Sequence, residues 1–365
     1  MTQLIAADHL WHEGALRRGF AIELSGGALQ RVRPLGIGET PDRHMHLLGP
    51  ALTDIQVNGS GGIMLNSDPS AEAIAHIVAT QRSLGTGWVM PTLITCETER
   101  MQRAADAARD AFGLDGFLGM HIEGPHLNIQ RKGTHNPAFI RPMEDATLQI
   151  IAELRAADIP VMLTLAPEVV PSDTIRRIAD MGVIVSAGHS AANAAQAQTG
   201  LEAGVSCFTH LYNAMPAMES RDPGIVGTAL SSEAFAGIII DGHHVDWRMV
   251  ALACRARPVS GRMFMVSDAM ATIGGPDHFE LYGETITVRD GALVNCSGSL
   301  AGAHIDLVGC LANGVRHVGL GLEEAYGMAA MVPRDAMRLD RPALHPGMPV
   351  AEMLALDDDL QLQPL

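Results

Sequence analysis

The sequence predicts an α/β protein with a (β/α)8 TIM-like barrel and a small β-sandwich domain built from the N- and C-terminal segments. Two observations carry this prediction. Between residues 50 and 339, eight short apolar runs alternate with helix-like stretches. Residues 1–49 instead contain alternating apolar and polar positions with glycine turns, which is typical of antiparallel strands. We therefore expect the barrel over residues 50–339 and the small β-domain over residues 1–49 and 340–365.

The eight apolar runs are the expected barrel strands. Each is apolar along most of its length, as a strand covered on both faces must be. The segments between them, such as AANAAQAQTGLEAG, are rich in alanine and repeat apolar residues every three to four positions, which favours helices. The expected strands are residues 51–57, 86–93, 117–123, 159–166, 182–189, 204–210, 236–242 and 262–269.

The composition excludes several classes of protein. The net charge of −16 argues against nucleic acid or an anionic membrane surface as a partner, because both bind clustered lysine and arginine. No stretch of about 18 apolar residues occurs, and the first residues lack the basic start and apolar core of a signal peptide, so we expect a cytoplasmic protein. The five cysteines are widely spaced without a Cys-x-x-Cys pair, which indicates reduced thiols.

Polar side chains follow the expected strands at their C-terminal ends, where a barrel of this kind carries its chemistry. In the run LGMHIEG, strand alternation turns His121 and Glu123 toward the barrel axis and Met120 and Ile122 toward the helices. The same alternation places Asp54, Gln56 and Asn58 on one face of the first strand, with Ile55 and Val57 opposite. The strand-end residues are Gln56, Asn58, Glu123, Glu168, His189, His210, Asp241, His243, His244 and Asp268.

Three of these residues form a candidate metal site. Two imidazoles and one carboxylate, from Glu123, His189 and His210, would leave an open position on zinc. Taken singly, a histidine at a strand end is more often a hydrogen-bonded structural residue, but three on one rim favour the metal. Asp268 ends the eighth strand and is expected to act as a general acid and base; its alternative role is an N-cap. His243 and His244 are adjacent, so at most one should face the site.

Nine segments, in the same order along the chain, carry a resemblance to a known family. The sequence resembles the N-acetylglucosamine-6-phosphate deacetylases of the amidohydrolase superfamily. The segments are PALTDIQVNGSGG, GMHIEGPHLN, RKGTHNP, SAGHS, THLYNAMP, DPGIVG, DGHHVD, SDAM and GSLAGA.

The resemblance implies a role for each candidate residue. It assigns Glu123, His189 and His210 to one divalent metal ion, expected to be zinc, with iron(II) or another divalent ion as alternatives. A single metal agrees with Gln56 and Asn58 standing where many amidohydrolases have His-x-His, since both hold metals poorly. Lys132 is the only lysine and follows no strand, so a carboxylated-lysine bridge is not expected. The resemblance makes Asp268 the catalytic carboxylate.

The remaining assignments concern the substrate and the assembly. The resemblance implies that His135 contacts the sugar or the amide carbonyl. It places the phosphate against Asn213, Ala214, Arg221 and His244, with Gln56 and Asn58 also in the substrate site, and it implies a homodimer in which some of these residues act across the interface. Three departures from the family pattern, at His126, at His243 and in AGAHIDL, are expected near the substrate pocket.

The expected reaction is hydrolysis of the acetamide of N-acetylglucosamine-6-phosphate to glucosamine-6-phosphate and acetate, by a metal-bound hydroxide with Asp268 as general base and acid. The galacto epimer of this amino-sugar phosphate is an alternative substrate. Another amidohydrolase activity, that of a cyclic amidase or deaminase, fits the metal site but leaves KGTHNP and THLYNAMP unused. A barrel without catalysis is the third alternative, and the complete set of site residues argues against it.

Overall fold

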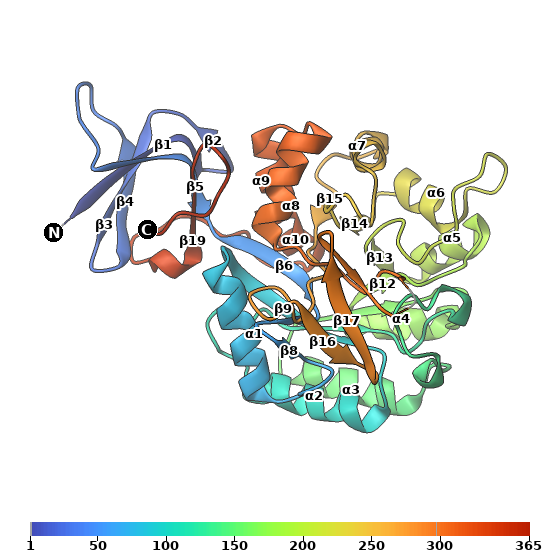
Figure 1. Ribbon diagram of the computed structural model, residues 1–365. Coiled ribbons are helices and arrows are strands. Elements are labelled where there is room, and N and C mark those ends of the chain that lie inside the picture. The colour runs from blue at the N-terminus through green and yellow to red at the C-terminus, as the bar shows by residue number, and fades with distance from the viewer. Residues whose placement is uncertain (1, 297) are drawn as a thin grey trace.

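The computed structural model describes residues 2–296 and 298–365, and it contains a barrel with a small β-domain set to one side (Figure 1). All eight expected strands are present and lie side by side in chain order in one parallel sheet. They are β6 (Leu52–Val57), β9 (Thr86–Ile94), β10 (Met120–Glu123), β11 (Val161–Leu165), β12 (Ile184–Ala187), β13 (Val205–Phe208), β14 (Phe235–Ile238) and β15 (Met263–Met265).

The backbone just beyond β15 closes the barrel. β6 and β15 are the two ends of the eight-stranded sheet. The amide of Asn58 donates to the carbonyl oxygen of Ala269 at 2.9 Å, and the amide of Asp268 donates to that of Gln56 at 3.1 Å. A bridge between Val57 and Ala269 completes the seam.

Helices cover the outside of the sheet, as the alternating pattern predicted. The alanine-rich helix α5 begins with a reciprocal pair of bonds, in which Asn193 caps the Gln196 amide and Gln196 caps the Asn193 amide, and it ends at Gly204 with φ 118°. The helices are α1 (Ala71–Ser83), α2 (Thr98–Asp110), α3 (Asp145–Ala156), α4 (Ser172–Asp180), α5 (Ala194–Ala203), α6 (Gly224–Ser231), α7 (Trp247–Ala256), α8 (Leu307–Asn313), α9 (Leu322–Ala330) and α10 (Val332–Ala336).

The strand alternation holds in β10 but fails at one position of β6. Ile122 packs in the large cluster with the helices, and His121 is buried on the other face, where its Nε2 lies 2.8 Å from Thr164 Oγ1. Ile55, predicted to face the helices, instead packs with interior residues such as Phe264. The pairing of β6 with β9 shifts register before Val57, and such a bulge changes which side chains face inward.

The small β-domain is a six-stranded sheet in the order β19-β5-β1-β3-β4, with β2 paired to β1. Its last strand comes from the tail and pairs antiparallel with β5, so the two ends of the chain build it together, as predicted. The strands are β1 (Gln3–His12), β2 (Ala15–Arg17), β3 (Phe20–Ser25), β4 (Ala28–Pro34), β5 (Arg43–Pro50) and β19 (Met353–Leu356).

Two short sheets were not predicted. A two-stranded ribbon follows β6, and a three-stranded antiparallel sheet follows β15. Side chains of the second sheet, including Phe279 and Leu281, pack against Ile94 and Met270 at the rim of the barrel. The strands are β7 (Gly59–Ser60), β8 (Ile63–Met64), β16 (His278–Leu281), β17 (Glu284–Arg289) and β18 (Ala292–Val294).

None of the described helices is both long and apolar enough to cross a membrane. The five cysteines are free thiols, of which Cys96, Cys207 and Cys310 are buried.

Candidate active site

Three predicted metal ligands converge where their strands end. Glu123 is the last residue of β10, while His189 and His210 follow β12 and β13. The Nε2 atoms of the two histidines each lie 3.0 Å from Glu123 Oε1 and 3.1 Å from one another. Both histidines have positive φ, 47° and 27°, a region that residues other than glycine seldom occupy.

The chemistry of this trio fits a divalent metal. His189 Nδ1 lies 2.8 Å from the carbonyl oxygen of Arg131 and donates to it, which leaves the lone pair of Nε2 facing Glu123 and His210. Two imidazole nitrogens and a carboxylate oxygen, all buried and within 4.8 Å, form a donor set that zinc and similar ions bind. Burial works to raise the pKa of Glu123, but His189 and His210 hold that pKa well below its usual range.

Asp268 lies beside the trio and is held by two amides. Asn58 Nδ2 donates to its Oδ1 at 2.7 Å, and Gln56 Nε2 donates to the same oxygen at 3.2 Å. Gln56 Nε2 also donates to Glu123 Oε2 at 3.2 Å, so one amide bridges both carboxylates. Burial, followed by repulsion from Glu123, raises the pKa of Asp268 to about 6. A carboxyl group in that range exchanges protons near neutral pH.

His135 approaches the trio from the loop after β10. Its Nε2 lies 4.0 Å from Glu123 Oε1, and its Nδ1 lies 2.7 Å from Thr95 Oγ1. Burial, reinforced by the charge of His189, lowers the pKa of His135 well below its usual value, so the ring is neutral at pH 7. A neutral ring held through one nitrogen presents the other nitrogen to the cavity.

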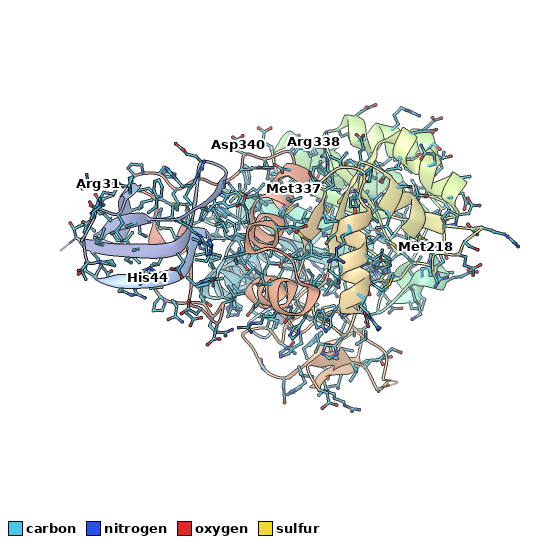
Figure 2. All side chains as sticks on the ribbon, turned by 90° about the horizontal axis from the view of Figure 1, so that it is seen from above. Arg31, His44, Met218, Met337, Arg338 and Asp340 are labelled. Atoms are coloured by element: carbon cyan, nitrogen blue, oxygen red, sulfur yellow. The ribbon has the colours of Figure 1, made fainter. Side chains whose placement is uncertain are left out.

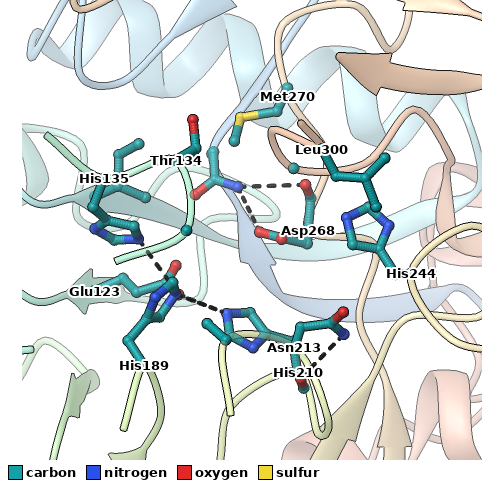
Figure 3. Close-up of a pocket in the computed structure, with 15 residues that line it drawn as sticks. Glu123, Thr134, His135, His189, His210, Asn213, His244, Asp268, Met270 and Leu300 are labelled. Atoms are coloured by element: carbon teal, nitrogen blue, oxygen red, sulfur yellow. Dashed lines mark hydrogen bonds and ion pairs between the residues drawn. The ribbon is translucent and has the colours of Figure 1, made fainter. Parts of the chain in front are cut away.

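A single cavity collects most of the predicted site residues (Figure 3). His244 reaches it with its ring fixed by Asp241, whose Oδ2 lies 2.6 Å from His244 Nδ1. Gln56 is buried behind Asp268 and does not belong to the lining. The cavity is lined by Asn58, Ile94, Glu123, Gly133, Thr134, His135, His189, His210, Asn213, Ala214, His244, Asp268, Met270, Leu300 and Gly302.

A family model for the amidohydrolases matches residues 47–343. The chain belongs to the amidohydrolase family. An N-acetylgalactosamine-6-phosphate deacetylase of Shewanella sp. (strain ANA-3) is 37% identical over 91% of this chain and 86% of its own length. An N-acetylglucosamine-6-phosphate deacetylase of Haemophilus influenzae is 32% identical over 88% of this chain and 86% of its own. The crystal structure of N-acetylglucosamine-6-phosphate deacetylase from Pasteurella multocida matches with a TM-score of 0.88 and 30% identity, over 99% of this chain and 97% of that chain.

Some residues of this amidohydrolase lie away from the cavity. Arg221 sits on an exposed loop and does not line the cavity of its own chain. His126 was expected near the substrate pocket, and this is wrong. It is fully buried, with Nδ1 3.1 Å from the carbonyl oxygen of Arg141 and Nε2 3.2 Å from Thr147 Oγ1. It is not among the residues that line the cavity.

Two further strand-end residues have structural roles. Glu168 accepts hydrogen bonds from Asn128 Nδ2, Ser190 Oγ and the Ala191 amide, and it thereby ties the loop after β10 to the loop after β12. His243 is exposed while His244 lines the cavity, which confirms that at most one of the adjacent pair faces the site. In AGAHIDL, Gly302 lines the cavity, whereas His304 does not and instead contacts Thr272 Oγ1 through Nδ1 at 2.9 Å.

The prediction missed Thr95. It also missed that the segment after β15 packs on the barrel rim and forms part of the cavity wall. Thr95 directly follows β9, so the strand-end rule that found Glu123 could have found it as well. The hydroxyl of Tyr282 donates to the carbonyl oxygen of Thr95, which ties the three-stranded sheet to the barrel rim. Met270 and Leu300 add apolar surface to the cavity wall; both stand in segments that carry the family resemblance, SDAM and GSLAGA, but neither was singled out as a site residue.

Proposed function

We propose that this amidohydrolase hydrolyses the acetamide of N-acetylglucosamine-6-phosphate, giving glucosamine-6-phosphate and acetate. The observation that carries the proposal is the convergence of Asp268, His135 and a buried Glu-His-His trio on one cavity. Relatives named as deacetylases of amino-sugar phosphates, which align over most of the chain, supply the substrate class.

Glu123, His189 and His210 would hold one divalent metal ion, which we propose to be zinc, with iron(II) as the alternative. Bound there, such an ion supplies Lewis-acid polarisation of the amide carbonyl and lowers the pKa of a bound water to about 7. Gln56 Nε2 donates to Glu123 Oε2, which leaves Oε1 directed at the two histidines.

Asp268 is the proton carrier of the proposed reaction. It takes a proton from the attacking water and passes it to the amide nitrogen, so the C–N bond breaks with a neutral amine leaving. The amides of Asn58 and Gln56 fix the carboxylate through Oδ1. Oδ2 is then the oxygen available for the proton.

His135 is the proposed hydrogen-bond donor to the carbonyl oxygen as that oxygen gains negative charge. Its Nδ1 makes a short contact of 2.7 Å with Thr95 Oγ1, whereas Thr95 Oγ1 lies 3.3 Å from the carbonyl oxygen of Glu123. We propose the tautomer in which the hydroxyl donates to Nδ1, because this tautomer places the ring proton on Nε2, facing the cavity, where the developing charge needs a donor. Loss of such a donor typically costs about a hundredfold in rate or more.

The phosphate end is assigned to Asn213, Ala214 and His244, which line the cavity. Asn213 and His244 lie away from His135 (Figure 3). Asp241 accepts from His244 Nδ1, so His244 presents Nε2 to the substrate. Arg221 stays a predicted phosphate contact from a neighbouring subunit, since it is exposed on its own chain. We accordingly propose a homodimer, located in the cytoplasm.

The galacto epimer is the second candidate substrate. The N-acetylgalactosamine-6-phosphate deacetylase of Shewanella is 37% identical to this chain, compared with 32% for the N-acetylglucosamine-6-phosphate deacetylase of Haemophilus influenzae. The two sugars differ only at one ring hydroxyl, so both fit the same acetamide chemistry and the same phosphate contacts.

The test is acetate release from N-acetylglucosamine-6-phosphate, from its galacto epimer and from unphosphorylated N-acetylglucosamine, with zinc-loaded protein. We expect rapid turnover of a phosphorylated sugar and slow turnover of the unphosphorylated one. The ratio of kcat/KM between the epimers identifies the preferred sugar. If zinc-loaded protein turns over none of the three, the proposed function is wrong while the fold stands.

A further inference from the structure

A second group of metal-ligating side chains lies on the small β-domain. Asp8 comes from β1, His44 and His46 come from β5, and Asp358 comes from the turn after β19. His44 lies on this domain, at the end of the molecule opposite Met218 (Figure 2). The group shares no residue with the active site, and nothing in the proposed reaction uses it.

The distances in this group fit metal coordination better than ion pairing. His46 Nδ1 lies 3.3 Å from Asp8 Oδ2 and 3.4 Å from Asp358 Oδ1. Hydrogen bonds between a charged nitrogen and a carboxylate are usually about 2.7–2.9 Å long. Ligands about 2.1 Å from a tetrahedral ion are about 3.4 Å apart. The two distances from His46 Nδ1 therefore match two edges of a zinc site, and the two carboxylate oxygens lie within 4.8 Å of one another.

The backbone fixes two of the ligands before any ion arrives. β1 and β5 are parallel neighbours, and the pairs Ala7 with Met45 and His9 with Leu47 bracket the position where Asp8 faces His46. The ring of His9 packs edge-on against that of His46, with 5.2 Å between their centres. This contact limits the orientations that the His46 ring can adopt.

The third ligand is held by a tight turn. Asp357 Oδ1 accepts from the amide of Asp359 at 3.0 Å and from that of Gln361 at 2.9 Å. Leu360, at the end of this turn, is buried in the main apolar cluster. Asp358 is thereby presented toward His46 although its own side chain is 91% exposed.

We propose that Asp8, His46 and Asp358 bind a divalent transition-metal ion, with zinc as the best match. Two carboxylates and one neutral imidazole balance a charge of 2+ and combine the oxygen and nitrogen donors that zinc accepts. His44 Nε2 lies 3.6 Å from Asp8 Oδ1 and, with water, is placed to complete the coordination. The ion would join the C-terminal turn to the first strand of the chain, so its role is structural and independent of the proposed deacetylase activity.

Equilibrium dialysis of the full chain against zinc tests the stoichiometry. We expect about two zinc ions per chain, one lost in His210→Ala and the other lost in His46→Gln and in Asp358→Asn. Asp359→Asn is the matched control, because it removes the same charge from the next exposed residue and should keep both ions. A chain that binds one ion, or a second ion that persists in both His46→Gln and Asp358→Asn, would overturn the proposal.

Digestion by a serine carboxypeptidase tests the structural role. Zinc at ten times its dissociation constant should slow release of the C-terminal residues about tenfold in the wild type and in His210→Ala. The same concentration should have no effect on Asp358→Asn, a variant whose exposed position makes misfolding a poor explanation. If zinc slows digestion of Asp358→Asn as much as that of the wild type, or does not slow digestion of the wild type, the proposed structural metal site is wrong, whatever the activity of the enzyme.

Discussion

Thr95→Val tests whether the hydroxyl of Thr95 positions His135 for catalysis. Valine matches threonine in shape but offers no partner for His135 Nδ1, which now lies 2.7 Å from the hydroxyl in a fully buried setting. Leaving a buried polar atom unpaired costs about 1–3 kcal/mol. If that cost falls on the transition state, kcat decreases about 5- to 150-fold.

The assay is steady-state acetate release, read together with metal content and thermal stability. Because Thr95 lies at the acetamide end, we expect the fall in kcat with little change in KM and with an unchanged amount of metal at the active site. Thr95→Ser keeps the hydroxyl and should recover most of the rate. These readouts separate a positioning role from simple loss of stability.

Thr147→Val is a matched control for this substitution. Thr147 is also buried, in α3, and its hydroxyl also contacts a histidine, at 3.2 Å from His126 Nε2, but this pair lies outside the cavity. Both variants should lose stability to a similar degree, and only Thr95→Val should lose rate. A kcat for Thr95→Val within twofold of the wild type would refute the reasoning about His135.

Three other predictions follow from the site. Asp268→Asn should lower kcat about 10²- to 10⁴-fold with metal content unchanged, and near-normal turnover would exclude the carboxylate as proton carrier. Arg221→Ala should raise KM for the phosphorylated sugar at least about tenfold, with little effect on the unphosphorylated sugar; equal effects would contradict a phosphate contact. Burial lowers the pKa of His126 from 6.5 to about 4. Between pH 6.5 and 4 the unfolded chain binds this proton and the folded chain does not, so lowering the pH through this range should reduce the free energy of unfolding by about 3 kcal/mol. Denaturation of His126→Phe over the same pH range should lack this loss.

The barrel and the convergence of the Glu-His-His trio were predictable because they depend on local patterns. Each strand is apolar along its length, and the strand-end rule brings Glu123, His189 and His210 together whatever their separation in sequence. The burial of His126 was not predictable in this way, since it depends on how the loop after β10 returns to Arg141. The side of β6 on which Ile55 lies was predicted wrongly for a similar reason, because the residue pattern gives no sign of the bulge in β6.

The three-stranded sheet after β15, in contrast, could have been predicted from the sequence but was not. The run ETITVRDGALV alternates and contains an Asp-Gly turn, which is a recognisable hairpin pattern. The prediction assigned all of residues 50–339 to the barrel and did not use this pattern. Thr95 was overlooked because a threonine in PTLIT fits the strand itself.

The seam of the barrel constrains how this enzyme can change during evolution. Asp268 carries the proposed catalytic carboxylate, while its amide donates to the carbonyl oxygen of Gln56 and its own carbonyl oxygen accepts from the amide of Ala303, so the same residue is also part of the wall. Exchanging its side chain leaves those main-chain bonds intact. Adding or removing a residue there would break these main-chain bonds and move the carboxylate at the same time. New substrate preferences are therefore more accessible through exchange of the side chains of Met270 and Leu300, which line the cavity, than through changes in chain length.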